Sequence, residues 1–223
     1  MGTTPQRRMV RRLDLERWLQ SVEAHPSPNA SLEQYTIPAD VAAEVLFIAA
    51  HMNNDIVDKN VVDLGCGTGR LAIGAAFLGA AESVGIDLDK SAVRVARRNA
   101  LNASVRDKIQ WIVGDLDVLH GSFHTVLENP PFGVQKRSAD QKFLLKALEL
   151  ASVVYSLHKS GEGNRAFIKR FIERRGGKVT SIYQMKLSIP RMFEFHTQRK
   201  HEVKVDLYRI ESARRSKDAS STI

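Results

Sequence analysis

The chain has 223 residues, 43% of them hydrophobic, which suffices to bury one sizeable core and is typical of a single domain. No apolar stretch approaches the roughly 18 residues of a transmembrane helix, and the polar N-terminus lacks the apolar segment of a secretory signal. A cytoplasmic protein with no membrane partner is therefore expected. The lone Cys66 excludes an internal disulfide and a cysteine-based zinc site within one chain. The net charge of +8 favours a polyanionic partner such as nucleic acid.

The predicted elements begin with two helices. Residues 1–12 are expected to be disordered, and residues 13–22 carry apolar side chains at helical spacing. A loop rich in proline and serine follows at residues 26–29. Pro38 then opens a second helix, because proline suits the first helical turn.

From residue 60 onward, short apolar runs alternate with amphipathic segments. Strands are expected at 61–64, 83–86, 109–113, 125–127, 153–157, 179–189 and 203–210, and helices at 70–78, 90–101, 139–151 and 163–175. Buried parallel strands between covering helices predict a Rossmann-like α/β fold. No helix separates the last two runs, so they are expected to pair antiparallel at one edge of a seven-stranded, mostly parallel sheet.

Three segments are expected along the chain. Residues 1–30 form a flexible N-terminal extension with a short helix, and residues 31–211 form a single domain. Residues 212–223 are polar and carry more basic than acidic side chains, which predicts a disordered basic tail.

A glycine-rich turn joins the first expected strand of this domain to the helix after it. The run Asp63-x-Gly65-x-Gly67-x-Gly69 permits a sharp turn and close approach of the backbone to a ligand. Its spacing differs from the Gly-x-Gly-x-x-Gly fingerprint of NAD-binding proteins. A carboxylate at Asp63 would repel a pyrophosphate but suits the cationic amino acid end of S-adenosylmethionine.

Two further acids follow the next two expected strands. Asp87 lies 22 residues after Gly65, where an acid grips ribose hydroxyls. Asp115 ends the third strand, where it can accept a hydrogen bond from the amine of an adenine, with Leu116 contacting the ring. The three acids together favour S-adenosylmethionine as the cofactor over a tight turn without a ligand.

The tetrapeptide Asn129-Pro130-Pro131-Phe132 follows the apolar run of the fourth strand. An amide oxygen can accept N–H protons from a planar amine, and an aromatic ring can stack on its face. The two prolines fix two φ angles and remove two N–H donors, which aims the Pro130 carbonyl rigidly. Combined with the glycine turn, the tetrapeptide predicts methyl transfer to an amino group.

The ordered motifs resemble class I S-adenosylmethionine-dependent methyltransferases that carry an Asn-Pro-Pro-(Phe/Tyr) motif. Among these, residues 32–210 are most similar to the small-subunit ribosomal RNA adenine-N6 methyltransferases of archaea and eukaryotes. The marks of this family are Leu32-Glu33-Gln34-Tyr35, Asp63-Leu64-Gly65-Cys66-Gly67, Asn129-Pro130-Pro131-Phe132-Gly133, Val154-Tyr155-Ser156-Leu157-His158-Lys159, Phe195-His196 and Glu202-Val203-Lys204-Val205-Asp206-Leu207.

The resemblance implies roles for individual residues. Gln34 and Thr36 would close over the cofactor, while the turn after the first strand would hold its methionine end. The expected cofactor-binding residues are Gln34, Thr36, Asp63, Gly65, Gly67, Thr68, Arg70, Asp87, Leu88, Asp115 and Leu116. The expected catalytic residues are Asn129, Pro130, Pro131 and Phe132. No metal is expected.

The resemblance also implies two partners, small-subunit ribosomal RNA and a small zinc-binding methyltransferase activator that adds a strand to a sheet edge. His158, at the end of the fifth strand, is expected to be a packed structural histidine. For Phe195-His196, RNA contact and loop packing are equally good interpretations.

Three alternative functions stay open. Protein glutamine N5-methyltransferases use the same geometry, but they carry Tyr at the position of Phe132 and a helical N-terminal domain, whereas only residues 1–31 precede Leu32 here. Guanine-N2 methylation of ribosomal RNA shares the motif. A non-catalytic RNA-binding scaffold would keep the fold but lose cofactor binding.

Overall fold

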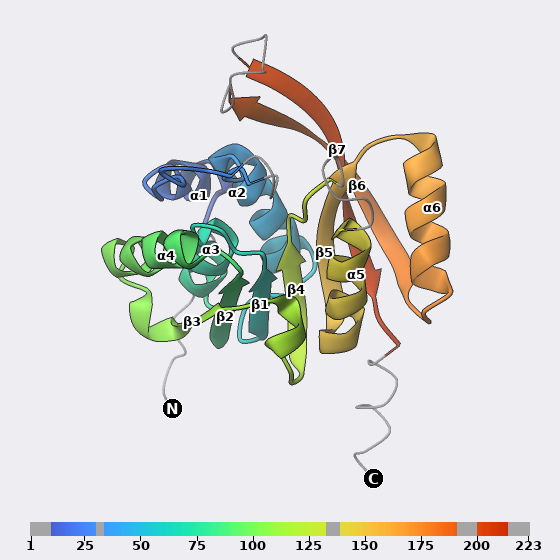
Figure 1. Cartoon of the computed structure of the whole chain (residues 1–223), viewed down its shortest axis with the longest axis horizontal. Coiled ribbons are helices and arrows are strands. Elements are labelled where there is room, and N and C mark those ends of the chain that lie inside the picture. Colours follow the sequence, from blue (N-terminus) through green and yellow to red (C-terminus); the bar gives the residue numbers. More distant parts are fainter. Residues whose placement is uncertain (1–9, 30–33, 133–138, 191–199, 214–223) are drawn as a thin grey trace, which may run out of the picture.

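A computed structural model describes residues 10–29, 34–132, 139–190 and 200–213 of the chain (Figure 1). The expected disordered ends, apart from residues 10–12 and 212–213, lie outside these residues. So do Leu32, Glu33, Gly133, Phe195 and His196 of the family marks.

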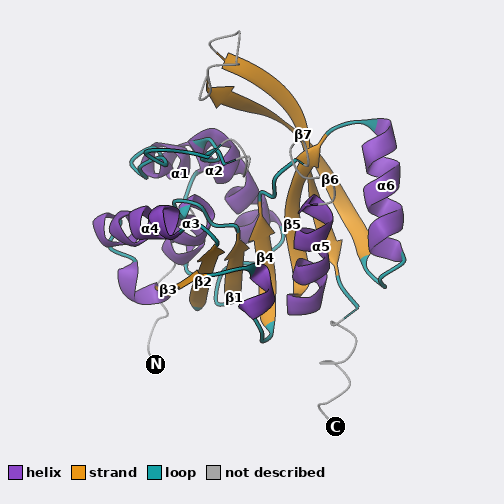
Figure 2. Cartoon of the chain, viewed as in Figure 1, coloured by secondary structure: helices purple, strands orange, loops and turns teal. Residues whose placement is uncertain are grey.

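One seven-stranded sheet forms the centre of the molecule (Figure 2). Its strands are β1 Asn60–Leu64, β2 Glu82–Asp87, β3 Ile109–Val113, β4 Phe123–Glu128, β5 Ala151–Lys159, β6 Lys178–Pro190 and β7 Lys200–Glu211. They lie in the order β3-β2-β1-β4-β5-β7-β6. The first five strands run parallel, and β7 pairs antiparallel with both β5 and β6. The predicted Rossmann-like sheet with an antiparallel edge is confirmed, with β6 as the outermost strand.

Helices cover both faces of the sheet. They are α1 Arg12–Leu19, α2 Ala39–Phe47, α3 Arg70–Leu78, α4 Lys90–Asn102, α5 Ala139–Leu150 and α6 Glu162–Glu173. The helices α1, α2 and α3 bury their apolar side chains in the core on one face, and α5 and α6 do so on the other. In α1, Leu15 and Leu19 have no exposed surface, so this helix packs firmly on the main core.

Local sequence signals set several helix ends. Pro38 directly precedes α2, and Gly79 ends α3 with a φ of 99°, a left-handed conformation that glycine adopts readily. The carboxylate of Asp89 caps α4 by accepting from the backbone N–H groups of Ser91 and Ala92. Beyond α2 the chain continues as a π-helix, Ile48–Met52, which apolar periodicity does not predict.

The indole ring of Trp111 on β3 packs over Gly69 and Gly85. A Cβ atom added to Gly85 would lie 2.4 Å from the Trp111 ring. We expect Gly85→Ala to lower the free energy of unfolding by about 1–3 kcal/mol, because the bulky ring must shift. The measurement is urea-induced unfolding followed by circular dichroism.

Gly163→Ala on α6 is the matched control, since a Cβ atom there meets no atom within 4 Å. This substitution is expected to leave stability unchanged or to raise it by up to about 1 kcal/mol through better helix propensity. An equal loss in both variants would contradict the packing argument.

Candidate active site

The carboxyl ends of β1, β2, β3 and β4 meet at one edge of the sheet, and a cavity lies there. All expected cofactor-binding residues line it, namely Gln34, Thr36, Asp63, Gly65, Gly67, Thr68, Arg70, Asp87, Leu88, Asp115 and Leu116. Asn129 and Pro131 line the same cavity. Residues far apart in the sequence are thus brought into one site.

The turn after β1 is shaped for close approach of a ligand. Gly67 has a φ of 53°, and a Cβ atom added to it would have no heavy atom within 4 Å. Its N–H group donates to Asp87 Oδ2 at 2.7 Å. The open side of this turn therefore presents backbone rather than side chain to the cavity.

The carboxylate of Asp87, at the end of β2, hydrogen-bonds to both the glycine turn after β1 and the segment that precedes α4. In addition to the bond from Gly67, its Oδ1 atom accepts from the N–H of Asp89 at 2.8 Å. Burial raises the pKa of the Asp87 carboxyl, and the backbone bonds oppose this rise. Ribose hydroxyls would supply further donors to this carboxylate.

Asp63 is buried beneath the turn, with 2% of its surface exposed. Its carboxylate accepts from the Ala72 N–H at 3.0 Å, near the start of α3. Burial, together with the negative charge of Asp87, raises the pKa of Asp63 to about 7, and the bond from Ala72 opposes this rise. A buried acid of this kind is stabilised in its ionised form by a nearby cation.

Asp115 lies at the rim of the cavity and is more exposed. Lys142 on α5 donates to its Oδ1 atom at 2.6 Å, and the backbone N–H of Asp117 donates to the same atom at 3.1 Å. The bond from Lys142 lowers the pKa of Asp115. Leu116, beside it, is buried and lines the cavity.

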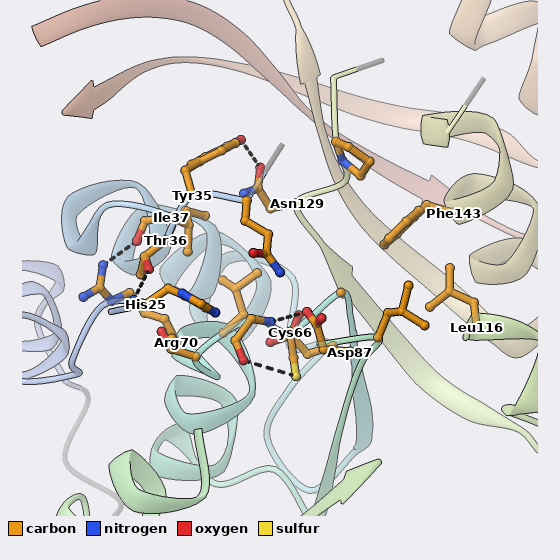
Figure 3. A pocket seen from close by; sticks show the side chains of 18 of the residues that line it. His25, Tyr35, Thr36, Ile37, Cys66, Arg70, Asp87, Leu116, Asn129 and Phe143 are labelled. Carbon is orange, nitrogen blue, oxygen red and sulfur yellow. Dashed lines mark hydrogen bonds between the residues drawn. The ribbon is translucent and has the colours of Figure 1, made fainter. Parts of the chain in front are cut away.

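Residues 34–37, named the strap here, follow α1 and precede α2 in the sequence and line the cavity. Three of them, Tyr35, Thr36 and Ile37, are labelled in Figure 3. Gln34 donates through Nε2 to Asp89 Oδ2 at 2.9 Å. The Thr36 hydroxyl oxygen accepts from the backbone N–H of His25 at 3.1 Å. The strap is thereby held at the side of the cavity where Asp87 and Asp89 lie.

Arg70 holds the strap in place through a hydrogen bond to its backbone. Its buried guanidinium donates to the backbone carbonyl of Ile37 and, at 2.7 Å, to that of Val22. Burial lowers the pKa of Arg70 to about 10. The sequence analysis placed Arg70 at the cofactor but did not predict this bracing, because the carbonyl partners are 33 and 48 residues away.

The tetrapeptide Asn129-Pro130-Pro131-Phe132 follows β4 and borders the cavity. Asn129 Oδ1 accepts a hydrogen bond from the Tyr35 hydroxyl at 2.8 Å (Figure 3). The Phe132 ring is half-buried, with its centroid 5.9 Å from that of Tyr35 and 5.7 Å from Lys159 Nζ. Pro130 is buried. An amide, an aromatic ring and a cation therefore lie close together beside the cavity.

A chain of buried polar side chains lies on the face of the sheet that α5 and α6 cover. The Ser156 hydroxyl donates to Glu128 Oε1 at 2.6 Å and lies 2.8 Å from His158 Nε2. Burial raises the pKa of Glu128 to about 8 and lowers that of His158 to about 3. The prediction of a packed structural histidine at position 158 is confirmed.

The sequence analysis missed several residues that line the cavity, including His25, Ile37, Cys66 and Phe143. His25 Nε2 lies 3.0 Å from Asp89 Oδ2. Phe143 is an apolar position on an amphipathic helix, so its spacing was indistinguishable from that of core residues. Tyr35 lay within a family mark, yet its pairing with Asn129 had no local signal.

Fold and site together define a class of protein. A parallel sheet with a glycine turn after β1, an acid at the end of β2, another after β3 and an amide after β4 is the architecture of class I methyltransferases. The buried acid Asp63 suits the ammonium of S-adenosylmethionine, and the open backbone of Gly67 suits close approach. The protein is an S-adenosylmethionine-dependent methyltransferase.

Comparisons with known proteins narrow the class. A family model described as ribosomal protein L11 methyltransferase (PrmA) matches residues 45–129, the portion that carries most of the cofactor cavity. The rRNA N(6)-adenosine-methyltransferase Mettl5 of Drosophila melanogaster is 36% identical, with 88% of this chain and 94% of that protein covered. The METTL5 enzyme of Danio rerio is 34% identical, with coverages of 88% and 97%.

A crystal structure described as a candidate RNA methyltransferase from Pyrococcus horikoshii is 38% identical and superposes with a TM-score of 0.85. The match covers 92% of this chain and 99% of that one. The chain belongs to the family of these rRNA N(6)-adenosine-methyltransferases.

The raised pKa of Glu128 predicts how stability varies with pH. Between the usual value of 4.5 and about 8, the folded protein keeps a proton that the unfolded chain has lost. The free energy of unfolding therefore falls as pH rises through this window. We expect Glu128→Gln to reduce the slope by up to about 1.4 kcal/mol per pH unit, because glutamine stays neutral.

The measurement is urea-induced unfolding of both proteins at pH 5, 6.5 and 8. Asp63, whose pKa is also raised, is present in both proteins, and its negative charge is one cause of the raised pKa of Glu128. Parallel pH dependences for the wild type and Glu128→Gln would contradict this assignment.

Proposed function

We propose that this protein transfers a methyl group to the N6 amine of an adenosine in small-subunit ribosomal RNA. The observation that carries the proposal is the Asn129 amide, which stands at the cofactor cavity with Phe132 beside it. An amide acceptor and a stacking ring suit a planar aromatic amine. The names of the full-length relatives support ribosomal RNA adenine as the class of substrate.

The chemical task lies with the nucleophile. When bound, S-adenosylmethionine supplies a methyl group on a positively charged sulfur, which is a strong electrophile. The N6 lone pair of adenine is delocalised into the ring. If Asn129 Oδ1 and the Pro130 carbonyl each accept an N6–H, the nitrogen can pyramidalise and expose its lone pair. Preorganised polar groups of this kind are typically worth about 3–4 kcal/mol.

Phe132 holds the base by stacking, which contributes roughly 1–3 kcal/mol per base. The adenosine must first leave its own stack or be unpaired. Lys159 is exposed beside the Phe132 ring and adds positive charge where the RNA backbone would approach. Pro131 lines the cavity and keeps the tetrapeptide rigid.

We assign the cofactor-binding residues by their places around the cavity. The strap residues Gln34 and Thr36 cover the cofactor. Asp87 and Leu88 hold the ribose, and Asp115 and Leu116 hold the adenine. The methionine end is held by Asp63, Gly65, Gly67, Thr68 and Arg70.

We further infer a methyltransferase domain at residues 31–211, onto which α1 of the N-terminal extension packs, and a basic tail at 212–223. Within the described ranges, no helix has the length and apolar character needed to cross a membrane. A cytoplasmic location is proposed because the ribosomal substrate is found there.

We propose that a small zinc-binding activator adds a strand to β3. Among the described strands, β3 and β6 form the two edges of the sheet. Val113 on β3 is 45% exposed, and the exposed Leu101 and Val118 lie on segments adjoining β3. Exposed apolar side chains beside an open strand edge suit strand addition.

Asn129→Ala is expected to lower the turnover number at least about 100-fold, as removal of a preorganised polar group typically does. Its affinity for S-adenosylmethionine should stay within about twofold of wild type, which corresponds to under 1 kcal/mol. Calorimetry measures the affinity, and transfer of labelled methyl to small ribosomal subunits measures activity. Asn102→Ala, an exposed position on α4, is the matched control.

Near wild-type activity in Asn129→Ala would refute the mechanism. In the same assay, label in ribosomal protein with none in RNA would overturn the substrate, and label on guanine would indicate the N2 reaction. RNA binding without cofactor binding would indicate a scaffold.

Val113→Lys is expected to weaken association with the activator at least about tenfold, since a charge on the edge opposes pairing. Ile182→Lys is the matched control, because Ile182 is 41% exposed on the opposite edge strand, β6. Co-purification and titration calorimetry measure association, and thermal unfolding checks the fold. Loss of binding only in Ile182→Lys would place the activator on the other edge.

A further inference from the structure

The Tyr35 hydroxyl forms a hydrogen bond with the side-chain amide of Asn129. It donates to Asn129 Oδ1 at 2.8 Å across 94 residues of sequence (Figure 3). A phenol O–H is a strong donor, whereas its oxygen is a weak acceptor because the lone pair conjugates with the ring. The contact therefore favours the amide oxygen, rather than the amide nitrogen, on the side of Tyr35.

The orientation of this amide decides what it can bind. The oxygen of an asparagine accepts two hydrogen bonds, while its nitrogen only donates. An incoming amine with two N–H groups needs the oxygen. With Tyr35 bound to one acceptor site of Asn129 Oδ1, the second site stays available, and the reversed amide is disfavoured because its NH2 group would face the phenol O–H.

Tyr35 is itself held in place by its neighbours in the strap. Gln34 is bonded to Asp89, and Ile37 to the buried guanidinium of Arg70. The Tyr35 ring is half-buried and packs against the same core as Phe132. The segment that carries the Tyr35 hydroxyl is therefore already held in place by these hydrogen bonds. Little further conformational entropy is lost when the hydroxyl orients the Asn129 amide.

We propose that Tyr35 is a positioning residue that fixes the Asn129 amide with its oxygen toward the methyl acceptor. The inference rests on the proposed role of Asn129 in binding an amine. It also links the two halves of the site, because the strap that lines the cofactor cavity orients the group that binds the acceptor.

The first test is Tyr35→Phe, which keeps the ring and removes the hydroxyl. Single-turnover methyl transfer to small ribosomal subunits is expected to slow about fivefold, in line with the loss of one ordinary hydrogen bond. The Kd for S-adenosylmethionine is expected to be unchanged. Tyr183→Phe on β6, also half-buried against this core, is the matched control and should transfer methyl at the wild-type rate.

The second test repeats Tyr35→Phe in an Asn129→Asp background. A carboxylate has two equivalent oxygens, so there is no amide to orient, and the further loss should be less than about twofold. An equal loss in both backgrounds would assign Tyr35 to packing or cofactor binding and overturn the proposal. So would a wild-type rate in Tyr35→Phe.

These outcomes separate the proposal from the proposed function. If the wild type places no label on adenine, the function fails. The comparison of the two backgrounds still reports on Tyr35, using whichever amine the enzyme methylates. If adenine is methylated and Asn129→Ala is inactive, but Tyr35→Phe transfers methyl at the wild-type rate, only the role of Tyr35 fails.

Discussion

The parallel pairing of β1 to β5 is the constraint on which the site depends. Strands that run in the same direction end at the same edge of a sheet, so the residues that follow them must meet there. Asp63 near the end of β1, Asp87 at the end of β2, Asp115 after β3 and Asn129 after β4 therefore line one cavity. No individual contact is needed to gather them, because the ladder of backbone hydrogen bonds already does so.

The strap, residues 34–37, covers one side of the cavity at this edge of the sheet. The strap closes one side through hydrogen bonds to the N-cap residue of α4, to the segment after α1 and to the residue that follows β4. The guanidinium of Arg70 also bonds to the strap. A guanidinium buried among backbone carbonyls is costly unless its donors are used. Two of its nitrogens bond to carbonyls of separate segments, so it couples the N-terminal helices to the cofactor cavity.

Differences in burial give the carboxyl groups near the cavity different pKa values. Asp63 and Glu128 are buried and Asp87 is partly buried, and burial raises the pKa of all three, whereas the bond from Lys142 lowers the pKa of Asp115 at the rim. A bound cation would compensate the cost of ionising Asp63. Glu128 stays neutral below its raised pKa.

The sequence by itself determined the parts of this protein that depend on local pattern. Apolar periodicity and glycine positions located the seven strands and the α-helices of the described sheet domain to within a few residues, and the motif after β4 predicted methyl transfer to an amino group. Only the tertiary structure decided that β7 lies between β5 and β6, that Arg70 braces the strap, and that Tyr35 meets Asn129. These contacts join residues dozens of positions apart, and packing of the whole core selects them rather than any preference of the neighbouring residues.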